Sequence, residues 1–62
     1  MTPRQLEVLQ LASEGLSGRA IAEQLVISRA TVKTHFENIY ASLGVSDRAA
    51  AVAVVMRVGL IR

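Results

Sequence analysis

The chain has 62 residues and no cysteine; 52% of its residues are apolar, 3% are aromatic, and its formal net charge is +2. A chain of this length forms one small domain, which buries only about 60% of its unfolded surface and leaves little volume for an enclosed substrate cleft. Without cysteine there is no disulfide framework and no Cys-based zinc site, and the single histidine, His35, has no partner at metal-ligand spacing. We therefore expect no enzyme and no cofactor.

The sequence contains no candidate membrane span and no signal peptide. Its longest apolar runs, 49–56 and 58–61, are well short of the roughly 18 residues that cross a bilayer. Residues 1–10 lack the basic start and apolar core of a signal peptide. We therefore expect a cytoplasmic protein with no membrane partner and no small-molecule substrate. The charge surplus alone is too small to indicate nucleic-acid binding.

The first helix is predicted over residues 3–14. Thr2, Pro3 and Gln5 supply an N-cap, a proline at the first helical position and the three-residue spacing of a capping box. Apolar residues then recur at three- and four-residue steps, which places an apolar stripe on one side of the helix. Gly15 ends the helix, because glycine accepts the left-handed conformation of a helix C-terminus.

A short helix over 18–25 and a longer helix over 29–42 follow, with a tight turn between them. Ser17 and Ser28 can cap these helices, because a serine hydroxyl accepts from the free amides of the first turn. A small residue in the first helix and apolar residues in the turn and second helix suit the close packing of a helix-turn-helix module: Ala22, Ile27 and Val32. Other small helical bundles show comparable spacing, so this pattern alone leaves both interpretations open.

The longer helix has two different faces. Its core-facing stripe falls at steps of four, three and four residues: Val32, Phe36, Ile39 and Leu43. The opposite face carries hydrogen-bonding groups with little apolar bulk: Arg29, Ala30, Lys33, Thr34, Glu37 and Asn38. A helix-turn-helix module presents such a face to the major groove of DNA.

The last helix, predicted over 47–58, is apolar on nearly every side. We expect its inward residues to be Ala51, Val52, Val55 and Met56. A second stripe then lies where a surface helix would normally be polar, and it suggests a partner: Ala50, Ala53, Val54 and Arg57. Four short helices joined by short turns predict one all-α unit.

A series of short elements runs through the whole chain at a characteristic spacing: Thr2-Pro3-Arg4, Glu7-Val8-Leu9, Glu14-Gly15-Leu16-Ser17, Ile21-Ala22 with Leu25, Ile27-Ser28, Thr31-Val32-Lys33 with His35, Asn38-Ile39-Tyr40, Leu43-Gly44-Val45, Arg48, Ala51-Val52 and Gly59-Leu60-Ile61. With these elements the chain resembles the LuxR/GerE family of DNA-binding domains from bacterial transcription factors. The resemblance implies a four-helix, all-α helix-turn-helix bundle over residues 1–62 that binds DNA as a dimer and regulates transcription. Family members usually carry an N-terminal receiver or sensor domain. We therefore favour a fragment, such as the C-terminal domain of a two-component response regulator, over a stand-alone regulator.

The resemblance implies two groups of DNA contacts. One group faces base edges in the major groove: Ala30, Lys33, Thr34 and Glu37. The other contacts phosphates and sets the register without reading sequence: Ser17, Arg19, Ser28, Arg29, Thr31, His35 and Arg48. Lys33 can donate to guanine O6 and N7 or to a phosphate, and the methyl group of Thr34 suits thymine.

Several of these residues have a structural interpretation as well. Lys33 can be a solvated surface residue, and His35 can equally be a partly buried structural histidine. Arg48 can pair with a helix-end carbonyl or a carboxylate as readily as with DNA. For Tyr40 we favour a core position, because it extends the stripe that contains Phe36.

Four positions depart from the usual pattern of the family. Gly18 and Ala20 stand where polar side chains are common, and Ser42 stands where lysine is common. Each lost phosphate contact lowers the log-log salt slope by about 0.9, so we expect weak binding by this domain alone. Glu37 repels phosphate unless it accepts from cytosine N4 or is neutralised, and an i,i+4 pair with Lys33 is worth only about a few tenths of a kcal/mol. We interpret Glu37 as partly a filter against wrong sites.

The second stripe of the last helix has a use in a twofold dimer. Such a dimer places two recognition helices about 34 Å apart on a pseudo-palindromic site. We expect a homodimer interface formed by Ala50, Ala53, Val54 and Arg57. The alternative is that this stripe packs against another domain.

Two rival functions can be compared with DNA binding. A helical protein-interaction module would bind another protein, with RNA polymerase as a candidate partner, and would leave DNA binding insensitive to Lys33→Ala. A small hydrolase has no support, because His35 is flanked by Thr34 and Phe36 and has no evident orienting carboxylate.

Overall fold

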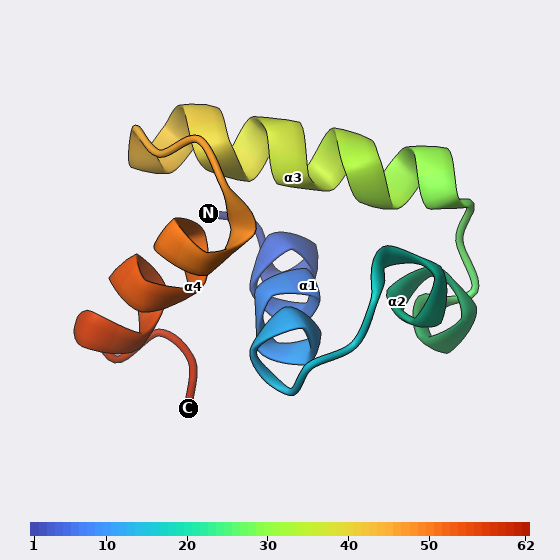
Figure 1. Cartoon of the computed structure of the whole chain (residues 1–62), viewed down its shortest axis with the longest axis horizontal. Coiled ribbons are helices and arrows are strands. Elements are labelled where there is room, and N and C mark those ends of the chain that lie inside the picture. The colour runs from blue at the N-terminus through green and yellow to red at the C-terminus, as the bar shows by residue number, and fades with distance from the viewer.

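The computed structural model describes residues 1–62 as four helices and no strands. The helices are α1 (Pro3–Ser13), α2 (Gly18–Leu25), α3 (Arg29–Leu43) and α4 (Arg48–Arg57). The long helix α3 runs along one side of the molecule, and the three shorter helices lie beneath it (Figure 1). The all-α prediction is confirmed, with one-residue differences at the ends of α1 and α3 and at both ends of α4.

Each helix begins at a side chain that accepts a hydrogen bond from its first turn. In the capping box of α1, Gln5 N donates to Thr2 Oγ1 at 3.2 Å and Thr2 N donates to Gln5 Oε1 at 3.1 Å. The other N-caps are Ser17, Ser28 and Asp47. Asp47 is therefore the residue before α4 and not its first residue. These caps satisfy amides that would otherwise lack partners, so they define where each helix starts.

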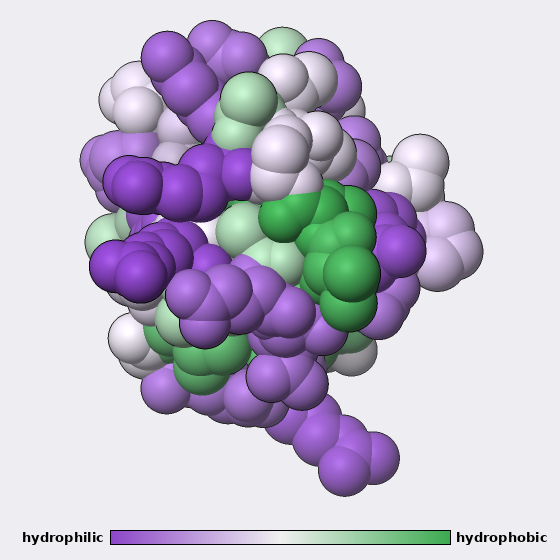
Figure 2. Space-filling model, turned by 90° about the vertical axis from the view of Figure 1, so that its right-hand side faces the viewer, coloured by the Kyte–Doolittle hydropathy of each residue, from purple (hydrophilic) through white to green (hydrophobic).

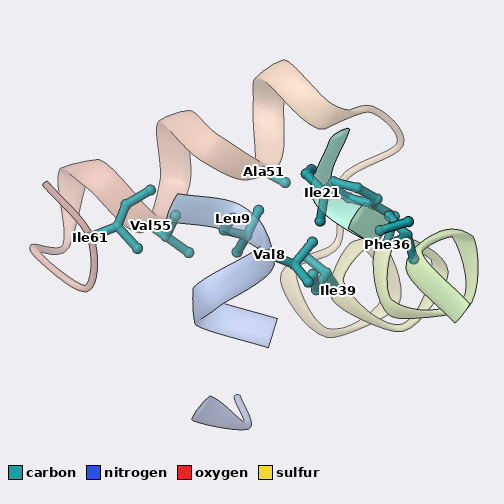
Figure 3. Packing of buried hydrophobic residues seen from close by; sticks show 10 residues of the cluster. Val8, Leu9, Ile21, Phe36, Ile39, Ala51, Val55 and Ile61 are labelled. Atoms are coloured by element: carbon teal, nitrogen blue, oxygen red, sulfur yellow. The ribbon is translucent and has the colours of Figure 1, made fainter. Parts of the chain in front are cut away.

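One apolar core joins all four helices (Figure 3). Its ten buried residues are all apolar: Val8, Leu9, Ile21, Ala22, Val32, Phe36, Ile39, Ala51, Val55 and Ile61. The predicted inward stripe of α3 is confirmed, with three buried residues and a half-buried Leu43 packed against them. Because the core contacts α3 along its length, the opposite face of α3 is held in a defined position.

The inward face of α4 differs from the prediction at one residue. Ala51 and Val55 are buried and Val52 is half-buried, but Met56 is 48% exposed. The reason is the tail that follows α4: Gly59 adopts a φ of +77° and turns the chain, and Ile61 enters the core. Ile61 fills the end of the core next to Val55 (Figure 3), so Met56 is not needed there.

The turn between α2 and α3 contains an unusual backbone conformation. Val26 ends α2 with φ 57° and ψ 48°, and it is the only residue other than glycine with a positive φ. The left-handed region is costly for a β-branched side chain. The reversal lets Ile27 N donate to Ala22 O at 3.0 Å, while the Val26 side chain is 89% exposed.

By length and composition, no single helix qualifies as a membrane span. The pair α3 and α4 would pass the same test together, but the two helices are bent by 57° at the break between them.

Candidate nucleic-acid interface

The outer face of α3 is polar and open to solvent over its first three turns. We use this name for the exposed residues Arg29, Ala30, Thr31, Lys33, Thr34, Glu37 and Asn38. The buried stripe of the same helix lies on the other side. The predicted separation of α3 into a core face and a hydrogen-bonding face is therefore confirmed.

A cleft of about 570 Å³ lies between the start of α2 and the outer face of α3. Several predicted DNA contacts meet on its walls: Ser17, Arg19, Arg29, Ala30, Lys33, Glu37 and Arg48. Four of these side chains are cations and one is a carboxylate. The cleft therefore concentrates positive charge that is sparse in the chain as a whole. Four other predicted DNA contacts do not line the cleft: Ser28, Thr31, Thr34 and His35.

Hydrophilic side chains cover much of the end of the molecule formed by α2 and the start of α3, and a hydrophobic patch interrupts them (Figure 2). Val26 belongs to this end of the molecule. It lies with Arg19, Glu23 and Arg29 along a second, shallow groove that follows the turn. Val26 is a residue that sequence reasoning placed in the turn without recognising its exposure. The signal for it was an apolar residue between the end of a helix and an N-cap.

The N-cap serines of α2 and α3 have different hydrogen-bond partners. Ser17 Oγ accepts from Ala20 N at 3.1 Å, and its hydroxyl proton has no partner within the chain. Ser28 Oγ accepts from Thr31 N at 3.0 Å and also lies 2.8 Å from Thr31 Oγ1, so these two hydroxyls share a hydrogen bond. Helix N-termini carry partial positive charge and favour anions. Ser17 is thus free to donate to an anion without losing its cap.

Arg48 is half-buried and makes two contacts within the protein. Its Nη1 donates to Leu16 O at 2.9 Å, and its Cζ lies 4.6 Å from the centroid of the Phe36 ring. The sequence analysis offered a helix-end carbonyl or a carboxylate as the structural partner; the partner found is a main-chain carbonyl, but Leu16 lies in the α1–α2 connection and not at a helix end. Arg48 links the start of α4 to the α1–α2 connection and to α3. A role as phosphate contact would have to use its remaining N–H groups.

The remaining cations of the site are less constrained. Arg19 Nε lies 3.3 Å from Glu23 Oε1, and both side chains are more than 70% exposed, so the pair is weak and open to competition. The only other ion pair joins Arg4 to Glu7. The predicted weak pair between Lys33 and Glu37 is therefore not formed.

Three more residues of α3 have defined surroundings. Thr34 is exposed, and its Oγ1 donates to Ala30 O at 3.1 Å, so the hydroxyl proton is used within the helix while the oxygen can still accept a hydrogen bond. His35 is half-buried, between the core stripe and the outer face. The ring of Tyr40 lies 5.8 Å from that of Phe36 and packs against the core, as expected.

The outer face of α4 is apolar but only partly accessible. Ala53 and Arg57 are exposed, whereas Ala50 and Val54 are half-buried. Met56 joins them on the exposed surface, a residue that the sequence analysis assigned to the core. Because nearly every residue of α4 is apolar, the sequence carried no signal that separates Met56 from its inward neighbours.

A short α2, a tight turn and a longer α3 with a polar outer face define a helix-turn-helix protein. The model of the family "Bacterial regulatory proteins, luxR family" matches residues 1–55. The chain is 51% identical over 57 residues to the probable transcriptional regulatory protein NarL of Mycobacterium tuberculosis, covering 92% of this chain and 26% of NarL. It is 44% identical over 62 residues to the transcriptional regulatory protein DegU of Brevibacillus brevis, covering 100% of this chain and 26% of DegU.

Two solved structures have the same fold. The transcription factor GerE matches with a TM-score of 0.95 at 37% identity, covering 100% of this chain and 92% of GerE. The response regulator ChrA of a heme-sensing two-component system matches with a TM-score of 0.93 at 47% identity, covering 97% of this chain and 30% of ChrA. The chain belongs to the luxR family of bacterial regulatory proteins.

Family membership confirms the DNA-binding, transcription-regulating class of the chain at a coarse level. The relatives are transcriptional regulators and not enzymes, in agreement with the sequence analysis. The chain spans about a quarter of the length of the curated relatives described above.

Proposed function

We propose that residues 1–62 form one sequence-specific unit for double-stranded DNA, with α3 in the major groove. The observation that supports this proposal most directly is the exposed polar face of α3 beside a cleft lined by four cations: Arg19, Arg29, Lys33 and Arg48. Burial of Ile61 supports including the tail in this unit. As a bacterial DNA-binding regulator, the protein would act in the cytoplasm.

Contacts with base edges would come from the middle of the outer face of α3. Fifteen helical residues span about 22 Å, which is long enough to follow the major groove. Lys33 has no internal ion-pair partner, so its ammonium is available to guanine O6 and N7. Ala30 and the Thr34 methyl group add apolar contact, and Glu37 lies one turn further along.

Phosphate contacts would flank these base contacts on both sides of the cleft. The Ser17 hydroxyl can donate while it remains a cap, and the Arg19 side chain can exchange Glu23 for a phosphate at little cost, because exposed pairs contribute about 0–1 kcal/mol. The other proposed phosphate contacts are Ser28, Arg29, Thr31, His35 and Arg48. Arg48 would contribute through the N–H groups that do not bind Leu16 O.

We further propose that two copies bind a pseudo-palindromic site through the outer face of α4. Ala50, Ala53 and Val54 allow close approach of a second helix, and exposed Met56 extends the apolar surface. Ala53→Glu tests this arrangement without altering the core, because Ala53 is exposed. We expect at least a tenfold loss of affinity for the palindrome and little change for a half-site, measured by sedimentation and anisotropy. An unchanged palindrome isotherm would exclude this interface.

The direct test of DNA binding is selection of bound sequences from random duplexes at two salt concentrations. Sequence-specific binding predicts that the same motif is enriched at both concentrations. Affinity should fall as salt rises, and each phosphate contact should steepen the slope of log affinity against log salt concentration by about 0.9. Enrichment of no motif, with strong salt dependence, would indicate only non-specific attraction.

The second candidate function is a protein-interaction module that does not read DNA. The observation that favours it is Val26, an apolar side chain that is 89% exposed on the α2–α3 turn. RNA polymerase, the candidate partner named from the sequence, would be bound directly by such a module. This function predicts binding to polymerase without DNA and no duplex binding in the selection experiment.

A further inference from the structure

We propose that Glu37 is a specificity-determining residue that accepts a hydrogen bond from the N4 amino group of a cytosine in the major groove. This inference rests on the proposed DNA-binding function and concerns which base that function selects. It makes the carboxylate an attractive contact for one base, in addition to a repulsive one for wrong sites.

Glu37 is exposed and lies on the same outer face as Lys33. Four residues of α-helix advance about 6 Å along the axis. Stacked base pairs are about 3.4 Å apart, so Lys33 and Glu37 can reach different base pairs within two steps of each other.

No cation of the protein forms an ion pair with the Glu37 carboxylate. Arg29, Lys33 and Arg48 line the same cleft as Glu37, yet both ion pairs of the chain involve other carboxylates. The Glu37 oxygens also accept none of the side-chain hydrogen bonds within the chain. Glu37 is therefore a free acceptor on a surface where the surrounding charge is mostly positive.

The chemistry of the major groove then selects the base. Guanine presents two acceptors there and thymine presents an acceptor and a methyl group, so neither can donate to a carboxylate. Adenine donates from N6 but places the acceptor N7 beside it, which repels the second carboxylate oxygen. Cytosine presents the N4 donor alone. A carboxylate brought against guanine or thymine loses water without gaining a hydrogen bond, and against adenine it gains one only beside the repelling N7 acceptor.

Lys33 has the opposite requirement on the same face. Its ammonium is donor-only and suits the O6 and N7 acceptors of guanine. The two side chains together predict a recognition site in which a guanine and a cytosine, on either strand, lie within two base pairs of each other.

Glu37→Gln gives a sharp test, because it keeps the shape of the side chain and changes its hydrogen-bonding pattern. Glutamine pairs bidentately with adenine N6 and N7. The matched control is Glu14→Gln, which removes the same charge at the end of α1 that points away from α3 (Figure 1). Wild type and each variant would be used to select bound sequences from random duplexes. Thermal melting would confirm that each protein is folded.

We expect wild type and Glu14→Gln to enrich the same cytosine, by about tenfold over the other bases, and Glu37→Gln to enrich adenine in that column. An unchanged preference for cytosine at that position of the motif selected by Glu37→Gln overturns the inference. An equal rise in affinity for all duplexes in both variants also overturns it, because it would reflect only the lost charge. If wild type enriches no motif, the proposed DNA-binding function itself fails, which distinguishes the two outcomes.

Discussion

The outer faces of α3 and α4 cover the same core from two sides but present opposite chemistry to solvent. The face of α3 carries charged, hydroxyl and amide side chains with alanine as its only apolar residue, whereas the face of α4 carries alanine, valine and methionine with Arg57 at its end. A face of the first kind suits a charged, hydrogen-bonding ligand such as DNA, and one of the second kind suits an apolar partner. In the function proposed above, this contrast divides DNA binding and self-association between the two helices.

The largest expected effect concerns the support of α4 by the tail. Ile61 is buried and closes the end of the core, so Ile61→Ala should lower the free energy of unfolding by about 2–4 kcal/mol. Met56→Ala is the matched control and should change stability by less than about 0.5 kcal/mol, because Met56 is exposed. Urea denaturation measures both, and equal losses would mean that Met56 packs inward as the sequence suggested.

The next effect concerns Arg48, which connects the two sides of the molecule. Arg48→Met removes the hydrogen bond to Leu16 O and the cation–π contact with Phe36, and should cost about 1–3 kcal/mol of stability. Arg19→Met removes an equal charge from an exposed pair and should cost about 0.5 kcal/mol or less. Equal melting temperatures for the two variants would show that Arg48 does not tie α4 to α3.

The smallest effect is a gain of stability at the turn before α3. Asparagine tolerates the left-handed conformation better than valine, so Val26→Asn should stabilise the domain by about 1 kcal/mol. Val58→Asn is the control, because Val58 is also exposed and follows a helix but has a φ of −90°. Thermal melting should show a rise for Val26→Asn only. A fall for that variant would mean that the Val26 side chain stabilises the turn.

Local patterns were sufficient to predict α3 and its neighbours. The caps Thr2, Ser17 and Ser28 and the regular spacing of Val32, Phe36 and Ile39 specify helix starts and a buried stripe, because these signals act over one or two turns. The outer face of α3 followed from the same spacing.

The features that the sequence did not reveal depend on contacts between distant segments. Arg48 pairs with Leu16, which is 32 residues away, and nothing near either residue indicates the partner. Ile61 displaces Met56 from the core because the chain turns back after α4, and a helix that is apolar on all sides has no period that shows which face is inward.

The central claim is that the outer face of α3 reads DNA. Its most direct test is the affinity of a selected duplex for wild type, Lys33→Ala and Arg62→Ala at several salt concentrations. The two variants lose the same charge, but Arg62 is at the C-terminus, far from α3 (Figure 1). We predict that Lys33→Ala loses tenfold or more in affinity, as expected for one base contact of about 1–3 kcal/mol, and that Arg62→Ala changes little. Equal affinities for the two variants would contradict the account.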